Sequence, residues 1–167
     1  MKTILIILIS LFTLFIIYWT NTHWTEKQKN EFSENCSNTE TINDLSFSFT
    51  GFSYNEIENV KVNQIHGGKI IDSFYVQPNK NTFDSIRTRY WASSTKLFYI
   101  KDTYQFIIKG NPPFILSDMK MIMWSQFTMF SEGYGCVMGD YKINGVRFSY
   151  DANPDFIKNG FKFPWDK

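Results

Sequence analysis

The chain has 167 residues, of which 43% are hydrophobic and 19% aromatic, with 17 lysines and arginines against 16 aspartates and glutamates. This length suits one domain of ordinary size, and so apolar a composition excludes a mostly disordered chain. The net charge of +1 argues against a protein that neutralises nucleic-acid phosphates through bulk charge, so no nucleic-acid partner is expected.

Residues 4–19 form an apolar run, ILIILISLFTLFIIYW, without a charged side chain. As a helix this run would rise about 24 Å, slightly less than the hydrocarbon layer of a bilayer, and it lacks the polar face of a soluble helix. We therefore predict one N-terminal transmembrane helix, with residues 1–24 as a signal anchor that binds the membrane. Lys2 precedes the run, which favours a cytoplasmic N-terminus and an exported remainder. A cleaved signal peptide and a secreted protein are the less favoured alternative, because no small-residue cleavage site follows.

Residues 25–44 are mostly polar and predict a stalk between the membrane and the domain that follows. The chain contains two cysteines, Cys36 and Cys136, and an even number in an extracytoplasmic protein suggests a disulfide. Such a bond would close a loop of about 100 residues, worth on the order of 4–5 kcal/mol through the chain entropy of the unfolded state. Two unpaired buried thiols are the alternative, and neither cysteine has the neighbours of a zinc site.

From residue 45 onward, apolar and polar side chains alternate as in strands with one buried face. We expect hairpins at Gly67-Gly68 and at Asn144-Gly145, because such turns need residues that tolerate positive φ. Residues 117–130 fit a strand or a helix, and their aromatic content favours the strand. The tail from Asp151 is expected to be irregular. The other expected strands cover residues 45–50, 60–65, 70–76, 86–91, 97–100, 104–109, 141–143 and 146–150. Residues 45–167 are therefore predicted to form a mainly β domain, an antiparallel β-sandwich or a partly open barrel.

The sequence holds little that indicates catalysis. It has two histidines, His23 and His66, and neither a Gly-x-Ser-x-Gly motif, a phosphate-binding glycine loop nor a His-Glu-x-x-His motif. We therefore predict that the protein is not an enzyme and uses no metal or cofactor. A deep pocket that joined His66 to a carboxylate would instead favour an enzyme.

Aromatic and basic side chains crowd the middle of the domain, where they could form a binding surface. Exposed aromatic residues of this kind contact proteins or stack on sugars, whereas buried ones form the core, which is the more frequent outcome. The two arginines are expected to share one face of a strand, where they could bind a carboxylate. Exposure of Trp91 and Tyr99 on one flat face would favour glycan binding. The candidate binding residues are Arg87, Arg89, Tyr90, Trp91 and Tyr99.

Two segments carry a resemblance to known proteins. Cys136 with the segment Tyr141-Lys142-Ile143-Asn144-Gly145-Val146 resembles the closing hairpin of small membrane-anchored envelope proteins of Bacteroidota-type bacteria. The segment Phe47-Ser48-Phe49-Thr50-Gly51-Phe52 adds to this likeness, which covers about a third of the chain. The chain departs from the common lipid-anchored form, because it has no lipobox cysteine, and the resemblance implies no particular activity.

The expected function follows from location and class. We predict a single-pass membrane protein whose C-terminal domain lies outside the cytoplasm and acts as a binding or structural module, with a protein or glycan partner in the cell envelope. A carbohydrate- or small-ligand-binding envelope domain is one alternative. A membrane-tethered immunity or inhibitor protein, which neutralises an exported toxin, is the other.

Overall fold

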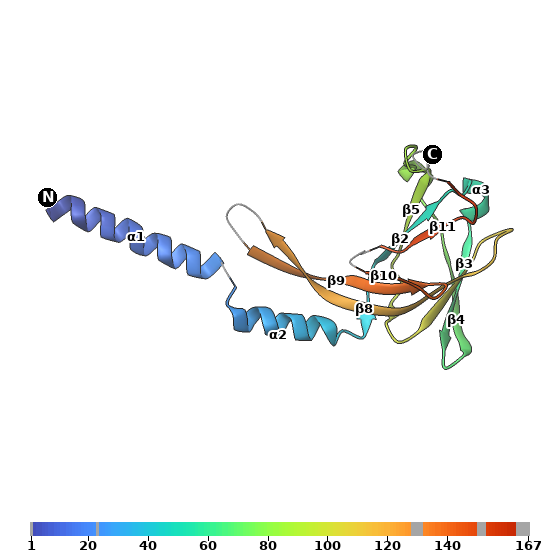
Figure 1. Ribbon diagram of the computed structural model, residues 1–167, viewed down its shortest axis with the longest axis horizontal. Helices are drawn as coiled ribbons and strands as arrows, with labels where there is room; N and C mark the ends of the chain where they lie inside the picture. The colour runs from blue at the N-terminus through green and yellow to red at the C-terminus, as the bar shows by residue number, and fades with distance from the viewer. Residues whose placement is uncertain (1, 23, 128–131, 150–152, 163–167) are drawn as a thin grey trace. The chain divides into compact units, whose positions relative to one another are not determined.

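The computed structural model describes residues 2–22, 24–127, 132–149 and 153–162, and its described part is mainly β (Figure 1). Residues 1–38 and 122–137 form a first unit, and residues 39–121 and 138–167 form a second. The helices are α1 (Lys2–Thr22), α2 (Glu26–Ser37), α3 (Tyr54–Ile57) and the 3₁₀ turn η1 (Lys80–Thr82). The strands are β1 (Thr41–Ile42), β2 (Leu45–Thr50), β3 (Val60–His66), β4 (Lys69–Val76), β5 (Arg89–Ser94), β6 (Phe98–Tyr99), β7 (Thr103–Ile107), β8 (Phe114–Phe127), β9 (Glu132–Ile143), β10 (Val146–Ser149) and β11 (Asp155–Ile157).

The apolar N-terminal run is helical, as α1. Its described side chains, from Ile6 to Trp19, are exposed, and the apolar ones have 44–66% of their surface accessible. The two hydroxyls bond within the helix, since Ser10 Oγ donates to the Ile7 carbonyl over 2.9 Å and Thr13 Oγ1 donates to the Ser10 carbonyl over 2.8 Å. Over the described residues, neither α1 nor another helix is both long and apolar enough to cross a membrane, so the predicted transmembrane helix is not supported.

The polar segment after α1 contains a helix, α2. Thr25 caps it reciprocally with Gln28: the Gln28 amide donates to Thr25 Oγ1, and Gln28 Oε1 accepts from the Thr25 amide over 2.9 Å. Such a capping box satisfies two backbone amides at the start of the helix, which favours a helix despite the polar composition. Residues 25–44, predicted as a stalk, therefore include twelve helical residues.

The predicted disulfide is confirmed within the first unit. It joins Cys36 in α2 to Cys136 in β9, with 5.5 Å between the Cα atoms. Trp24 packs edge-on against Tyr134 at 5.1 Å between ring centroids, and Lys29 pairs with Glu132 over 2.8 Å. The disulfide and these contacts fix α2 to this part of β9.

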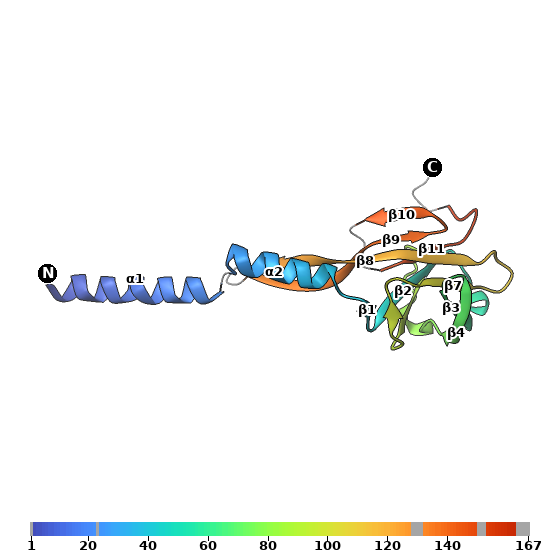
Figure 2. The same cartoon turned by 90° about the horizontal axis from the view of Figure 1, so that it is seen from below.

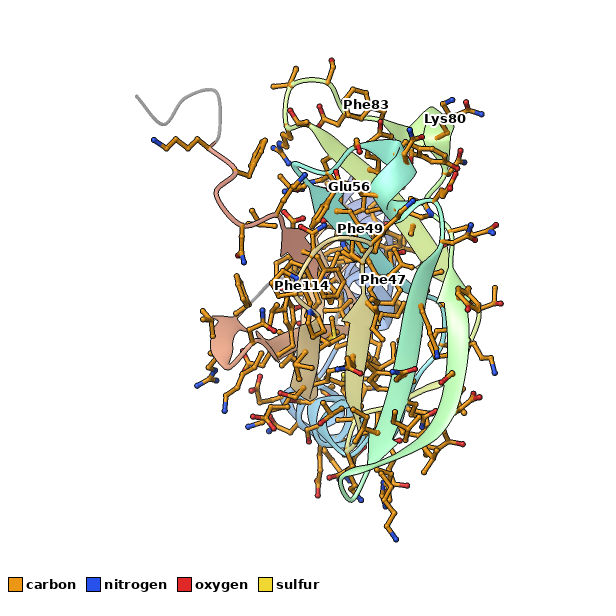
Figure 3. All side chains as sticks on the ribbon, turned by 90° about the vertical axis from the view of Figure 1, so that its right-hand side faces the viewer. Phe47, Phe49, Glu56, Lys80, Phe83 and Phe114 are labelled. Atoms are coloured by element: carbon orange, nitrogen blue, oxygen red, sulfur yellow. A yellow bond between two sulfur atoms is a disulfide. The ribbon has the colours of Figure 1, made fainter. Side chains whose placement is uncertain are left out.

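Two sheets build the core of the second unit, to which β8 contributes residues 114–121 and β9 residues 138–143. One has the order β10-β9-β8-β7-β3-β4, and the view from below in Figure 2 shows β10, β9 and β8 side by side. The other has the order β11-β2-β5. Their facing side chains are aromatic: the Phe106 ring of β7 lies 5.1 Å from that of Phe47 in β2 and 4.3 Å from that of Phe156 in β11. These residues are fully buried, and Figure 3 shows Phe47, Phe49 and Phe114 in the interior. This packing fits the expected β-sandwich.

Several local predictions are confirmed. β3 and β4 form a hairpin through Gly67 and Gly68, and β9 and β10 form one through Asn144 and Gly145; all four residues have positive φ, as two-residue hairpin turns require. The ambiguous segment is a strand as far as Phe127, in β8, and residues 128–130 lie outside the described residues.

Three predictions of strand position are wrong, and in one of them β9 begins at Glu132 rather than at residue 141. β5 begins at Arg89 rather than at residue 86, because Asp84 Oδ1 accepts from the amides of Ile86 and Arg87 and holds them in a turn. The tail is not wholly irregular, since β11 pairs parallel with β2 and adds Phe156 to the core. A parallel neighbour leaves no hairpin signal, because its partner lies far away in the sequence.

Candidate functional site

A hollow that combines ionisable and aromatic side chains lies beside the turn between β6 and β7. It encloses about 450 Å³, a volume within the range of small-molecule sites. β3 contributes Gln64 and His66, β4 contributes Ile71, and β6 contributes Tyr99. The complete lining consists of Glu40, Gln64, His66, Ile71, Tyr99, Lys101 and Asp102. We call this the Tyr99 hollow.

A buried carboxylate organises one wall of the Tyr99 hollow. Asp102 is 4% exposed, and each of its oxygens accepts a hydrogen bond. His66 Nδ1 lies 2.6 Å from Asp102 Oδ1, and Gln64 Nε2 donates to Asp102 Oδ2 over 2.5 Å. Because Nδ1–H donates to the carboxylate, the other nitrogen of the neutral His66 ring, Nε2, lies exposed as an acceptor. Gln64 is itself buried, so this polar group is fixed by the sheet rather than by solvent.

An exposed ion pair forms another part of the lining. Lys101 Nζ lies 2.9 Å from Glu40 Oε1. This hydrogen bond, with the attraction between the charges, lowers the pKa of Glu40 and raises that of Lys101 from their usual values. The backbone keeps the two residues close, because β1 pairs with β6 and the Ile100 amide donates to the Glu40 carbonyl over 2.9 Å.

Tyr99 supplies an aromatic surface whose position is set by its backbone. Tyr99 is 46% exposed. Its backbone amide donates to the hydroxyl of the buried Tyr104 over 2.7 Å. Burial raises the pKa of Tyr104 to about 12, so this phenol stays protonated at physiological pH. The Asp102 amide also donates to the Tyr99 carbonyl over 3.0 Å, which closes the turn between β6 and β7.

Of the five candidate binding residues, Tyr99 alone lines this hollow. Arg87 is exposed in the turn before β5, and Arg89 lies inside β5, so the two arginines do not share a strand face. Trp91 and Tyr99 belong to different sheets and are not joined in a flat platform by any contact within the described residues. Tyr90 packs against Phe83, with 4.6 Å between ring centroids.

Arg89 takes part in a closed polar cluster. Its Nη2 lies 2.5 Å from Asp155 Oδ2, and its Nε donates to Thr50 Oγ1 over 3.0 Å. The Thr50 hydroxyl in turn donates to Asp155 over 2.8 Å, and the guanidinium lies 5.5 Å from the centre of the Trp91 ring. Both charged side chains are only 15% exposed. This arrangement, which we call the Arg89 cluster, joins the three strands of the β11-β2-β5 sheet and presents little surface to a ligand.

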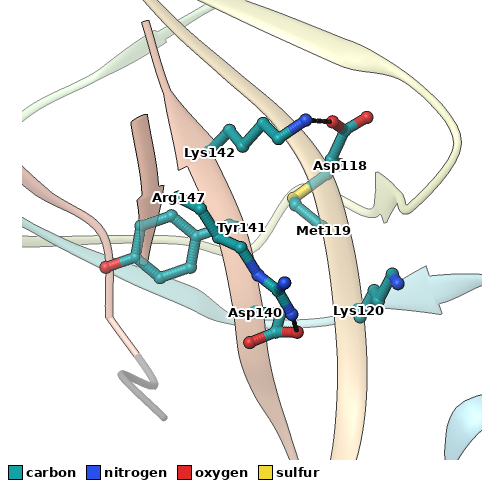
Figure 4. Close-up of a pocket in the computed structure, with 7 residues that line it drawn as sticks. All are labelled: Asp118, Met119, Lys120, Asp140, Tyr141, Lys142 and Arg147. Carbon is teal, nitrogen blue, oxygen red and sulfur yellow. Dashed lines mark hydrogen bonds and ion pairs between the residues drawn. The ribbon is translucent and has the colours of Figure 1, made fainter. Parts of the chain in front are cut away.

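A second hollow, of about 300 Å³, lies over β8, β9 and β10 (Figure 4). Its two carboxylates are paired, with Lys142 Nζ 2.7 Å from Asp118 and Arg147 Nη2 2.5 Å from Asp140. These hydrogen bonds lower the pKa of both aspartates. Cross-strand ion pairs of this kind are common on solvated sheets, so we interpret this hollow as a charged surface rather than a binding site.

The sequence did not reveal the partners that make His66 part of a site. Asp102 lies in the turn before β7, and only the antiparallel pairing of β3 with β7 brings it beside His66. Within the described residues no group of three or more histidine, cysteine, aspartate or glutamate side chains could hold a metal ion. No family model matches the chain, and no curated protein and no solved structure is detectably similar to it. The resemblance to envelope proteins therefore stays a prediction.

Proposed function

We propose that the protein is a non-catalytic binding protein of the cell envelope that holds a small ligand in the Tyr99 hollow. The observation that carries this proposal is the hollow itself, because it places an exposed aromatic ring beside side chains fixed by buried hydrogen bonds. Preformed sites with an apolar surface and a few oriented polar groups are the usual form of small-ligand sites.

Ligand-observed NMR on the full chain in detergent micelles would test this function. The probes are small-molecule mixtures of stated class: neutral sugars, charged sugars, amino acids and nucleosides. We expect at least one class to bind, and its binding to weaken strongly in Tyr99→Ala. The control is Tyr75→Ala, which removes an equally large exposed ring from β4 outside the lining. Binding that persists unchanged in Tyr99→Ala, or binding by no class, would contradict the proposal.

We further propose that the domain lies outside the cytoplasm and that α1 holds it at the membrane. The disulfide supports an oxidising compartment, and the exposed apolar side chains of α1 suit contact with lipid. The protein should remain in the membrane fraction after an alkaline wash, and external protease should digest its domain on intact cells. Leu11→Lys should weaken retention, whereas Asn30→Lys, which adds the same charge to α2, should not. A wild-type protein that washes off, or that external protease cannot reach, would refute this location.

A hydrolase is the second candidate, favoured by one observation, the contact between His66 and Asp102. A carboxylate that accepts from Nδ1 orients an imidazole so that the opposite nitrogen can take a proton from water. The lining contains no serine, threonine or cysteine, so the nucleophile would have to be water. Mass spectrometry of a bound ligand after prolonged incubation separates the candidates. Product that forms with wild-type protein but not with His66→Ala would establish the hydrolase and reject the non-catalytic function.

A further inference from the structure

The charges of the Tyr99 hollow indicate which ligands it can hold. Every carboxylate in the lining already has a partner: Glu40 pairs with Lys101, and Asp102 pairs with His66. An anion that approached Lys101 would meet Glu40 beside it, and a cation that approached Glu40 would meet Lys101. Asp102 is not available to attract a cation, because it is buried and both of its oxygens accept hydrogen bonds from His66 and Gln64. The lining therefore disfavours strongly charged ligands.

The same lining offers two kinds of contact to an uncharged ligand. Tyr99 and Ile71 provide exposed apolar surface, with 46% and 57% of each residue accessible. Such surface can pack against the C–H face of a ligand's ring. Tyrosine provides a large contact area at a small cost in side-chain entropy.

Polar atoms beside the apolar surface can contact groups that both donate and accept. Because Nδ1–H of His66 donates to Asp102, the exposed Nε2 of the neutral ring is an acceptor. Gln64 Nε2 is used by Asp102, which leaves Oε1 of this buried amide as an acceptor without a donor among the described residues. Hydroxyl groups suit both atoms, because each hydroxyl donates one hydrogen bond and accepts others.

We propose that the Tyr99 hollow binds a neutral saccharide, with the C–H face of one sugar ring on Tyr99 and hydroxyl groups directed at His66 and Gln64. This inference rests on the proposed binding function and specifies its ligand class. A sugar ring combines an apolar face with a hydroxyl-bearing edge and carries no charge to be repelled by the Glu40–Lys101 pair.

Titration calorimetry of the full chain in detergent would test this ligand class. The probes are glucose, galactose, mannose and N-acetylglucosamine, each also as a short oligosaccharide, with glucuronic acid and glucosamine as charged analogues. We expect a neutral sugar to bind at least about tenfold more tightly than its charged analogue. Tyr99→Ala should weaken that binding at least about tenfold, because an aromatic ring that packs on a ligand is often a main contributor to affinity. A tenfold loss of affinity corresponds to about 1.4 kcal/mol. Tyr75→Ala should leave the binding unchanged.

The outcomes separate the ligand class from the function. Tyr99-dependent binding of glucuronic acid, glucosamine, an amino acid or a nucleoside in preference to the neutral sugars would overturn the saccharide class while the binding function stands. Neutral sugars that bind equally well to Tyr99→Ala would overturn the assignment to this hollow. Binding by none of the sugars would overturn the saccharide class, and binding by no class in the NMR screen either would reject both proposals.

Discussion

The Arg89 cluster and the Tyr99 hollow are built from the same kinds of side chain, yet they differ in exposure. Each has an ion pair and an aromatic ring: Arg89 and Asp155 with Trp91 in the first, and Lys101 and Glu40 with Tyr99 in the second. The side chains of the ion pair are 15% exposed in the cluster, and those of the pair Lys101–Glu40 are more than 70% exposed in the hollow. A buried ion pair is costly to break and inaccessible to ligands, whereas an exposed pair contributes little to stability. The difference in exposure therefore makes the Arg89 cluster a structural element and the Tyr99 hollow a candidate site.

The largest difference should follow from removing one carboxylate in each region. Asp155→Ala leaves Arg89 buried without its partner and should lower the free energy of unfolding by about 3 kcal/mol. Glu40→Ala breaks an exposed pair and should cost about 0.5 kcal/mol or less. Chemical unfolding of the full chain followed by circular dichroism measures both. Equal losses in the two variants would refute the distinction between the closed and the open region.

Asp102 sharpens the comparison, because it lines the hollow but is buried. Asp102→Ala would leave Gln64 Nε2 without its acceptor, and we expect a loss of about 2 kcal/mol in the free energy of unfolding. Lys101→Ala, at the neighbouring exposed position, should change it by about 0.5 kcal/mol or less. The same unfolding measurement applies. A neutral effect of Asp102→Ala would mean that the buried hydrogen bonds do not hold the wall of the hollow.

The sequence predicted what depends on local patterns. Alternation gave the strands, and Asn144-Gly145 gave a hairpin, because both are decided by neighbours along the chain. The Thr25-x-x-Gln28 spacing was a local signal for α2 that the polar composition obscured. The site was different: His66 meets Asp102 only through the pairing of β3 with β7, and Arg89 meets Asp155 only through the parallel pairing of β11 with β2. Contacts between strands that are distant in sequence leave no local pattern. The sequence could therefore not show that Arg89 is largely buried and Tyr99 exposed.

Glu56 provides a case of intermediate exposure, with a dependence on pH. Its carboxylate pairs with Lys158 over 2.7 Å and accepts from the Ser53 amide over 2.9 Å, and these hydrogen bonds lower the pKa of Glu56 from 4.5 to about 2. A lowered pKa means that the carboxylate adds stability above pH 4.5, and that this stability disappears as the pH falls through about 2. Glu56→Gln should therefore cost about 1 kcal/mol at pH 7 and almost nothing near pH 2.

Unfolding of wild type and Glu56→Gln at several pH values checks this dependence. The exposed Glu58 lies two residues further along and has no ion-pair partner among the described residues, so Glu58→Gln serves as the matched control and should show no such trend. A difference between wild type and Glu56→Gln that stayed constant from pH 7 to pH 2 would show that the ionised carboxylate is not what stabilises the contact between α3 and the segment after β11.

The smallest effect on stability is expected where the largest effect on binding is proposed. Tyr99→Ala should change the free energy of unfolding by about 0.5 kcal/mol or less, because the ring is half-exposed and the contacts that fix Tyr99 belong to its backbone. Trp91→Ala should cost about 2 kcal/mol, since this ring lies against the Arg89 guanidinium and is more buried. Thermal unfolding of both variants measures the contrast. A loss above about 1 kcal/mol for Tyr99→Ala would place its ring in the packing of the fold. Weaker ligand binding in that variant would then report a damaged hollow and not a lost contact, so this stability measurement must accompany the binding test.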